Sequence, residues 1–538
     1  MHKSQGEGRP RRRGSITEFF DWVAGDKAIK DIMDGVNTSW TRLNAPEIHD
    51  AVTAIVQNYK IENPEKSVKD LVQLYKLVNI LPSSVWKNYK LAEIKSLVQA
   101  CAGLFMEATS TQQQVFPGKN LPMQFSMNQR ANVQVNLGLV QLPGRDSVFN
   151  KNMGVNQNLV WDHNYSIPLT QPISQPYWLV SPKTEGMFVV NDQQLIGQPE
   201  NDPAFTCKLN VTIENQLFEF QIPVQYKYVD PTKGEVHQPI AVVPGQEIKY
   251  DKELHLMNGE KSIPVNYQII NHLGKNESKS FTVSDPNVQL PTPANAVFQK
   301  TIQYDHISTI TYFPTATTTL VKTQVNTKGK KIGYIDGAGD KIPEALVELG
   351  FSVTYLKPTD FVVEKLKSFD AIIVGIRAYN LYEYLTNDNE ELNKYIEQGG
   401  NVIVQYIKSN QVGLQKIKVG PYPFIVNSGR RVTQENVPVT FALPQHVVLN
   451  TPNKITATDF ENWVQERSTY QAENIDTHFE MPLAMSDKGE VPSNGSLLIA
   501  PYGKGNFVYL SLTLFRQLPA GNPGAFKLLA NLIALPKH

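Results

Sequence analysis

The sequence predicts a multidomain protein in which a helical segment is followed by antiparallel β-sandwich domains and then by an α/β domain with a parallel sheet. Three observations lead to this prediction. An early stretch has apolar residues at helical spacing, a long middle stretch alternates apolar and polar residues, and a final stretch alternates apolar strands with amphipathic helices. At 538 residues, the chain is long enough for several separate hydrophobic cores.

Residues 15–110 are predicted to be helical. Ser15 and Glu18 have the spacing of a capping box, which indicates a helix start ahead of Phe19 and Phe20. Apolar residues then recur at intervals of three and four, the spacing of one buried helix face. This spacing predicts a small helical bundle. The three stripes are Ile48, Val52, Ile55, Val56 and Tyr59; Val68, Leu71, Val72 and Tyr75; and Leu91, Ile94, Leu97, Val98, Cys101, Leu104 and Phe105.

Two antiparallel β-sandwiches are predicted to follow, over residues 111–225 and 226–326. Strict alternation of apolar and polar residues on both sides of Glu214-Asn215-Gln216 predicts a hairpin with one buried face. Other short runs, separated by clusters of glycine, proline and asparagine, continue this pattern. Cys207 lies in the hairpin and is expected to be buried.

The last domain, residues 327–538, is predicted to be α/β. Its strands are expected at residues 332–336, 352–356, 370–375 and 401–406, and several of them are apolar throughout. Helical stretches lie between these strands, and continuous apolar strands alternating with helices indicate a parallel sheet covered on both faces. A hairpin, from Ser496 to Pro501 and from Asn506 to Ser511, and a helix from Pro523 to Leu535 are expected to close the chain.

A ligand of such a sheet is expected in the crevice beyond the carboxyl ends of the strands. Arg377 and Tyr379 follow one predicted strand, and Gln405 and Tyr406 end the next. These four residues are therefore candidate ligand-binding residues.

Trp463, Glu466 and Arg467 form a second candidate ligand-binding cluster. Arg467 could clamp a carboxylate or phosphate, and Trp463 could stack on a sugar. The alternative, which we favour, is an internal ion pair and a core tryptophan.

Several functional classes are excluded by composition. The chain has 51 Lys+Arg and 51 Asp+Glu, so it lacks the basic field that non-specific nucleic-acid binding requires. It has no apolar run long enough to span a bilayer. Two cysteines exclude a disulfide framework and any multi-cysteine metal site.

Motifs of catalysis are absent as well. The sequence contains no G-x-S-x-G elbow, Walker A loop, H-E-x-x-H or C-x-x-C, and no two histidines stand at i, i+3 or i, i+4. Gly337-Ala338-Gly339 could meet a phosphate, but Ile342 occupies the place of the third glycine, so a plain tight turn is the better interpretation. No catalytic or metal-binding residue is predicted.

Several strings, in order, resemble large bacterial members of the PIG-L (LmbE-like) deacetylase family, especially those of the Bacteroidetes type. The first, residues 2–6, resembles the end of the zinc deacetylase domain of that family, and the others resemble its C-terminal region. The strings are His2-Lys3-Ser4-Gln5-Gly6; Ile332-Gly333-Tyr334-Ile335 with Gly337-Ala338-Gly339-Asp340; Val374-Gly375-Ile376-Arg377-Ala378-Tyr379-Asn380; Val404-Gln405-Tyr406; Gly420-Pro421-Tyr422-Pro423-Phe424; Asp459-Phe460-Glu461-Asn462-Trp463-Val464-Gln465-Glu466-Arg467; and Phe515-Arg516-Gln517-Leu518-Pro519-Ala520-Gly521.

The resemblance implies a remnant of the deacetylase domain in residues 1–14, and a flavodoxin-like domain similar to class I glutamine amidotransferases in residues 327–538. The family's zinc-binding His-Pro-Asp-Asp and His-x-x-His motifs are missing from this sequence. The amidotransferase cysteine is also missing, because Tyr406-Ile407-Lys408-Ser409 occupies its place. We therefore expect a non-catalytic C-terminal portion of a deacetylase of N-acetylglucosaminyl substrates, truncated at its N-terminus.

This expectation includes the cofactor and the surroundings of the protein. No cofactor is expected in this chain, since zinc would belong to the upstream domain. The expected partner is a carbohydrate or glycoconjugate, and neither nucleic acid nor a membrane span is expected. A periplasmic or secreted location is expected if the full-length protein has a signal peptide. Two alternatives remain, namely a freestanding carbohydrate-binding or scaffold protein and a hydrolase with an unrecognised site near Arg377, Tyr379 and Gln405.

Overall fold

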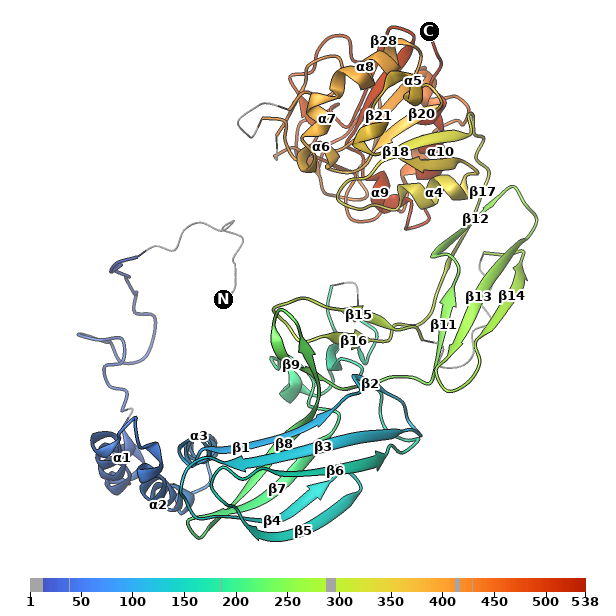
Figure 1. Ribbon diagram of the computed structural model, residues 1–538. Coiled ribbons are helices and arrows are strands. Elements are labelled where there is room, and N and C mark those ends of the chain that lie inside the picture. The colour runs from blue at the N-terminus through green and yellow to red at the C-terminus, as the bar shows by residue number, and fades with distance from the viewer. Residues whose placement is uncertain (1–12, 38, 185, 287–296, 412–416, 428) are drawn as a thin grey trace. The chain divides into compact units, whose positions relative to one another are not determined.

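A computed structural model describes residues 13–37, 39–184, 186–286, 297–411, 417–427 and 429–538, so most of the predicted remnant at residues 1–14 lies outside the described residues. The chain forms two compact units (Figure 1). Unit 1 comprises residues 1–243 and 301–311, and unit 2 comprises residues 244–300 and 312–538. The predicted mixture of helices and many β-strands, distributed over several sheets, is confirmed.

Unit 1 begins with three α-helices, α1 (Pro46–Asn58), α2 (Val68–Asn79) and α3 (Val85–Cys101). They bury part of each apolar stripe that the sequence predicts, with Ile48, Val72 and Val98 at most 1% exposed, whereas Val56, Tyr59 and Leu97 of the same stripes are exposed. The helix predicted to start at Ser15 is not formed, and residues 15–23 have no regular structure. The capping-box pattern is present there, but the apolar side chains of this segment are each more than half exposed.

The third predicted helical stripe is partly wrong. Helix α3 ends at Cys101, and Leu104 and Phe105 begin strand β1 (Leu104–Ser110). The physical cause is Gly103, whose φ of +58° is a left-handed conformation that ends a helix, and whose N–H donates to the carbonyl of Ala100.

The rest of unit 1 is dominated by one strongly curled eight-stranded sheet (Figure 1). Its main path runs β5-β4-β7-β8-β1-β3-β6, and β9 pairs with β8. The two arms of the curl enclose an apolar core, which is compatible with the predicted sandwich. The strands after β1 are β3 (Asn120–Gln129), β4 (Val135–Leu142), β5 (Arg145–Asn152), β6 (Leu159–Ser166), β7 (Thr206–Ile213), β8 (Gln216–Asp230) and β9 (Gly234–Pro239).

The predicted hairpin is confirmed as β7 and β8, which pair from Thr206↔Pro223 to Ile213↔Gln216. Cys207 is fully buried, as expected. The domain boundary predicted at residues 225 and 226 falls inside β8, because β8 leaves β7 at Pro223 and continues along β1 and β9.

Unit 2 starts with a β-rich part. A three-stranded sheet contains β11 (Gln246–Tyr250), β13 (Ile263–Asn271) and β14 (Glu277–Val283), and β12 (Leu254–Asn258) pairs in parallel with β17 (Thr319–Thr323). Leu256 and Val321, from this parallel pair, share a core with the α/β part that follows.

The α/β part carries a six-stranded sheet in the order β19-β18-β20-β21-β29-β28. All its neighbouring strands are parallel except β28 and β29, which form the predicted closing hairpin. Its strands and main helices are β18 (Lys331–Ile335), α4 (Ile342–Glu348), β19 (Ser352–Tyr355), β20 (Ala371–Val374), α8 (Asn389–Glu397), β21 (Asn401–Gln405), β28 (Leu497–Tyr502), β29 (Gly505–Leu510) and α10 (Pro523–Ile533).

The central strands β20 and β21 are buried along their whole length, as expected for a parallel sheet covered on both faces. One face packs on α4 and α10, and the other packs on α8 and the segment around Phe424. The short elements are β2 (Gln114–Val115), β10 (Ala241–Val242), β15 (Lys300–Ile302), β16 (Ile310–Tyr312), α5 (Val363–Leu366), α6 (Ala378–Leu381), α7 (Tyr384–Asn387), β22 (Ile425–Val426), β23 (Arg431–Val432), β24 (Thr440–Phe441), β25 (Ser468–Thr469), β26 (Ala472–Glu473), β27 (Leu483–Ala484) and α9 (Leu514–Gln517).

Within the described ranges, none of the helices combines the length and apolar character that crossing a membrane requires.

Candidate functional site

The carboxyl ends of β20 and β21 bring three predicted site residues together. The N–H of Arg377, just after β20, donates to the carbonyl of Tyr406, just after β21, at 2.9 Å. Gln405 ends β21 and its Nε2 donates to Asp340 at 3.2 Å. Arg377 has a φ of +60°, and its Nε is buried with no hydrogen-bond partner among the described residues. The predicted crevice therefore contains an arginine whose side chain is not fully used by the fold.

The glycine loop after β18 is closed against the neighbouring loop. The N–H of Ala338 donates to the carbonyl of Ile376 at 2.8 Å, and a Cβ added to Gly337 would lie 2.2 Å from that same carbonyl oxygen. Gly337 is therefore needed for a close approach of two backbones. This geometry supports the tight-turn interpretation, since the backbone of the loop contacts the backbone at Ile376.

Asp340 connects the ends of three strands. One of its carboxylate oxygens accepts from the hydroxyl of Tyr334 at 2.7 Å, from Gln405 at 3.2 Å and from the N–H of Ile376 at 3.3 Å. Gln405 is only 2% exposed, so its amide serves this internal network and offers little surface to a ligand.

Tyr379 also points inward. It is 3% exposed, and its hydroxyl donates to Asn389 at 3.3 Å. Burial raises its pKa well above the ordinary value. Of the four residues predicted at the sheet edge, Arg377 and Tyr406 are the two that remain partly exposed.

Glu466 is held beside them by two arginines. Arg431 donates to its two carboxylate oxygens at 3.1 and 2.6 Å, and Arg516 donates to one of them at 2.5 Å. The side chain of Glu466 is 7% exposed, whereas those of Arg431 and Arg516 are 43% and 30% exposed. The cluster therefore presents two guanidinium groups and hides its single carboxylate.

Aromatic rings border these arginines. Tyr406 stacks on Tyr470 with centroids 5.4 Å apart and an angle of 13° between the planes, and its centroid is 5.3 Å from that of Phe515. Burial raises the pKa of Tyr406, and the nearby charges of Arg377 and Arg516 offset part of this rise. We call this surface the arginine–aromatic shelf. Its residues are Arg377, Tyr406, Arg431, Glu466, Tyr470, Phe515 and Arg516.

Trp463 and Arg467 lie inside the protein, at 3% and 4% exposed. The indole N–H of Trp463 donates to the carbonyl of Asp459 at 3.0 Å, and the guanidinium of Arg467 donates to the carbonyls of Phe460 and Val437. Burial lowers the pKa of Arg467 to about 10. Both side chains are therefore part of the protein core, as the favoured alternative expects. The partners of Arg467 are backbone carbonyls, however, and not the acidic side chain of an ion pair.

The two cysteines both belong to unit 1, whereas the shelf belongs to unit 2. Cys101 is half-buried and Cys207 is buried. Burial raises the pKa of the Cys207 thiol to about 12, which disfavours the reactive thiolate.

One group of possible metal ligands occurs among the described residues. Glu107, Glu235 and His237 place one ligand atom each within 4.8 Å of one another. Lys227 lies between them, with Nζ at 3.1 Å from Glu107 and 3.0 Å from Glu235. The ammonium group already contacts both carboxylates and balances one of their two negative charges, so a cation occupies this place without a metal ion.

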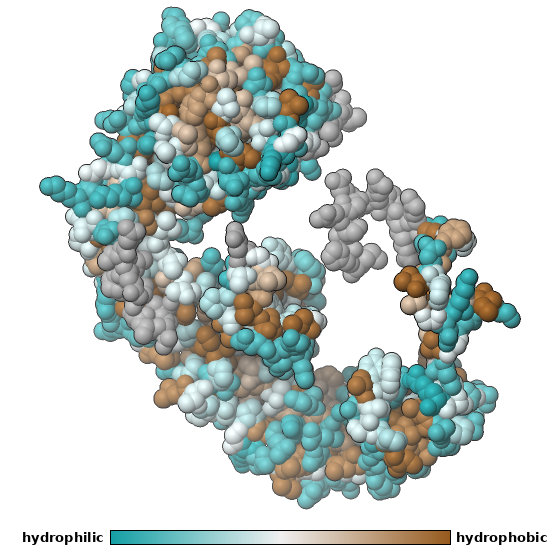
Figure 2. Space-filling model, turned by 180° about the vertical axis from the view of Figure 1, so that it is seen from behind, coloured by the Kyte–Doolittle hydropathy of each residue, from teal (hydrophilic) through white to brown (hydrophobic). Residues whose placement is uncertain are grey.

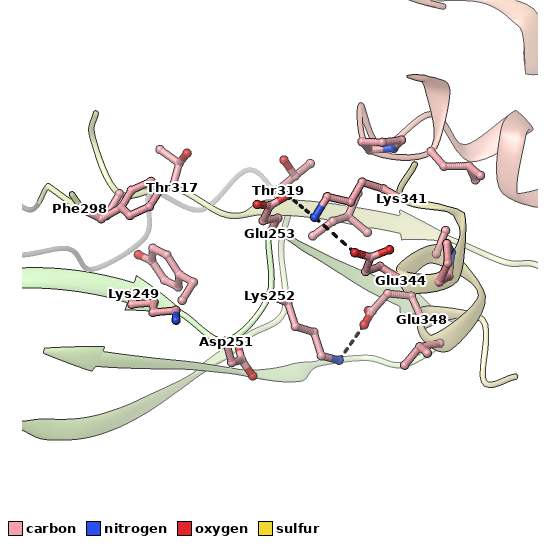
Figure 3. A pocket seen from close by; sticks show the side chains of 18 of the residues that line it. Lys249, Asp251, Lys252, Glu253, Phe298, Thr317, Thr319, Lys341, Glu344 and Glu348 are labelled. Carbon is pink, nitrogen blue, oxygen red and sulfur yellow. Dashed lines mark hydrogen bonds and ion pairs between the residues drawn. The ribbon is translucent and has the colours of Figure 1, made fainter. Parts of the chain in front are cut away.

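Unit 2 also contains a groove of about 890 Å³ between its β-rich and α/β parts (Figure 3). Most charged side chains along it are paired. Lys252 bonds to Glu348 at 2.7 Å, and Lys341 lies 3.2 Å from Glu344 and 3.6 Å from Glu253. This pairing ties the two parts of the unit together and leaves the groove without one dominant charge.

The sequence reasoning missed four shelf residues, Arg431, Tyr470, Phe515 and Arg516. Phe515 and Arg516 begin one of the strings that carry the family resemblance, and this could have marked them as candidate site residues. Arg431 and Tyr470 stand in an irregular stretch of short strands, where no periodicity points to a shared surface.

No family model matches the chain, and no curated protein matches it. Among solved structures, an alkylpurine DNA glycosylase, AlkC, from Pseudomonas fluorescens, bound to DNA with an abasic-site analogue, is 10% identical with a TM-score of 0.12, over 31% of this chain and 48% of the other. The sporulation control protein Spo0M from Bacillus subtilis is 8% identical with a TM-score of 0.11, over 34% of this chain and 90% of the other. Likenesses this weak carry no argument about fold or function.

Proposed function

We propose that this chain is a non-catalytic portion of a PIG-L-type zinc deacetylase, with an amidotransferase-like α/β domain that binds and positions a ligand. The observation that carries the proposal is the arginine–aromatic shelf at the carboxyl edge of the α/β sheet. It supplies guanidinium groups and half-exposed rings, and it has no cysteine in the position where an amidotransferase-like domain would hold its nucleophile.

The side chains of the shelf suit a sugar that carries an anionic group. Rings of Tyr406 and Phe515 can pack against the apolar face of a sugar, while guanidinium groups form paired hydrogen bonds with carboxylate or phosphate. Glu466 bonds to both Arg431 and Arg516. Because these bonds already hold the two arginine side chains in place, little conformational entropy is lost when a ligand binds.

The absence of catalysis is the first testable part. Purified chain supplied with Zn²⁺ should release no acetate from N-acetylglucosaminyl substrates, because the sequence has neither zinc motif of the family. Turnover comparable with that of an intact family member would refute the proposal.

Ligand binding is the second part. Isothermal titration with N-acetylglucosamine oligosaccharides, with and without a carboxylate or phosphate group, should show weak binding that favours the anionic forms. Arg377→Gln should weaken this binding about tenfold or more, since one guanidinium contact to an anion contributes roughly 1.5–3 kcal/mol. Arg145→Gln, on exposed strand β5 of unit 1, is the matched control and should leave binding unchanged. Equal binding of neutral and anionic sugars would contradict the proposal that the arginines bind an anionic group.

A further inference from the structure

Among the described residues, an apolar stripe near the start of unit 1 is left exposed. Ile16, Phe19, Phe20 and Val23 are all exposed, with 91% of Phe19 and 88% of Val23 open to solvent. Figure 2 shows hydrophobic side chains along the stretch that precedes α1. Their spacing of i, i+3, i+4 and i+7 is that of one helix face, and Ser15 begins the stretch with a capping-box pattern. An isolated helix this short is not stable in water, so it requires a surface to pack on.

The three helices of unit 1 provide an apolar groove of about 370 Å³. Its walls come from all three helices, and three of its apolar side chains, those of Val56, Trp86 and Leu97, are each more than half exposed. The apolar lining consists of Trp40, Leu43, Val52, Ile55, Val56, Leu71, Leu74, Trp86, Ile94 and Leu97.

We propose that residues 15–26 fold as an amphipathic helix in this groove and that the occupant is this segment of the same chain. An amphipathic helix that places i, i+3, i+4 and i+7 side chains in an apolar groove is a common recognition mode. The stripe ends at Val23, and Ser39 and Trp40 already line the groove, so only a short stretch of chain connects the two. This short tether gives the segment a roughly millimolar effective concentration, which favours it over a free partner.

Charge supports the same occupant. The segment carries Glu18, Asp21 and Asp26, and the groove rim carries Arg42. Arg42 makes a cation–π contact with Trp86 at 5.1 Å, and its charge can also receive a carboxylate from the docked helix. The other basic residue of the rim, Lys90, is already bonded to Glu93 at 2.8 Å.

Disulfide trapping in the full chain tests the proposal, in a Cys101→Ala background. Ala24→Cys with Glu93→Cys keeps every apolar side chain of the stripe and groove, and Glu93 lines the groove. Ala24→Cys with Ala92→Cys is the matched control, because Ala92 is exposed on the same helix but does not line the groove. The native Cys207 stays unreactive because it is buried.

Under mild oxidation, the groove pair should form an intrachain disulfide at least about tenfold faster than the control pair, because both pairs share one tether and only docking in the groove brings residue 24 closer to residue 93. Adding Phe19→Asp and Phe20→Asp to the groove pair should remove this advantage. Equal rates for the two pairs, disulfides between two chains, or no disulfide at all would each overturn the proposal.

Amide hydrogen exchange gives a second readout without engineered cysteines. Residues 15–26 and the exposed face of α3 should be protected in the unaltered chain and lose protection together in the Phe19→Asp, Phe20→Asp variant. Protection that arises only when another protein is added would identify a different occupant and overturn the proposal.

Discussion

Glu466 in unit 2 and Lys227 in unit 1 have the same local arrangement with opposite signs. Glu466 contacts two arginines, and Lys227 contacts two glutamates. The side chain of Glu466 is 7% exposed, whereas that of Lys227 is 26% exposed and its partner Glu235 is 53% exposed. Charge pairs in water contribute little, while a buried charge that loses its partners costs several kcal/mol. The comparison indicates that burial, rather than the number of ion pairs, decides which cluster the fold depends on.

The largest effect is expected at Glu466. Arg431→Gln together with Arg516→Gln should destabilise unit 2 by about 2–3 kcal/mol, because the carboxylate of Glu466, only 7% exposed, would then be left without either partner. Urea unfolding followed by tryptophan fluorescence measures this change. The control is Arg430→Gln, since Arg430 pairs with Glu473 on the surface and its loss should cost less than about 1 kcal/mol. Equal losses in the two variants would contradict the role of burial.

A smaller effect is expected at Arg467, whose guanidinium donates to two backbone carbonyls. Arg467→Met should cost about 1–2 kcal/mol, because it leaves the buried carbonyls of Phe460 and Val437 without these donors. Thermal unfolding of the variant and the unaltered chain tests this. A variant more stable than the unaltered chain would mean that desolvation of the guanidinium outweighs its hydrogen bonds.

His255 extends the comparison to a group that titrates. It is 3% exposed, and burial lowers its pKa even though Asp251 lies 3.4 Å away. The unfolded chain therefore binds the proton more readily, so this contribution to stability is complete above the ordinary histidine pKa near 6.5 and declines as the pH falls below it.

Between pH 7.5 and 5.5, His255 should account for a loss of up to about 1 kcal/mol in unfolding free energy. Urea unfolding at several pH values measures the slope, and His255→Gln should reduce it. His237→Gln, at the half-exposed cluster in unit 1, is the control. An unchanged slope in the His255 variant would place the pH dependence elsewhere.

The smallest change in stability is expected at Lys227. Lys227→Met should cost less than about 1 kcal/mol, because the cluster is open to solvent. The same change removes the one positive charge that Glu107 and Glu235 share, and it leaves both carboxylates and His237 open to a cation. Added Zn²⁺ should therefore raise the melting temperature of the variant and not that of the unaltered chain. A zinc effect of equal size on both chains would show that Lys227 does not exclude the ion.

The sequence predicted best where local and tertiary signals agree. The α/β strands were found because β20 and β21 are buried on both faces and are therefore continuously apolar. The helix expected at Ser15 is not formed in the structure because a capping box acts only within a turn and cannot supply the surface on which a short helix packs. Leu104 fits both a helical stripe and a strand, and Gly103 decides between the two.

The candidate site shows the same limit. Arg377 and Tyr406 were placed together correctly because neighbouring parallel strands end at one edge of a sheet. Arg431 and Tyr470 reach that edge through irregular segments, so no periodic pattern could assign them. Residue type alone could not show that Arg467 points inward, since an arginine suits a ligand and a set of buried carbonyls equally well.

The way the chain passes between the two units limits how each unit can be expressed separately. The polypeptide leaves unit 1 after Val243, returns to it after Lys300 and leaves again after Thr311. Within unit 1, the returning stretch is fastened by Gln238, which accepts from the N–H of Thr309 at 2.8 Å. A fragment that stops at Val243 would lack this stretch, and a protease that nicks one connection would leave the halves covalently joined by another. Residues 301–311 belong to unit 1, so a clone of unit 2 alone requires a linker that joins Lys300 to Tyr312.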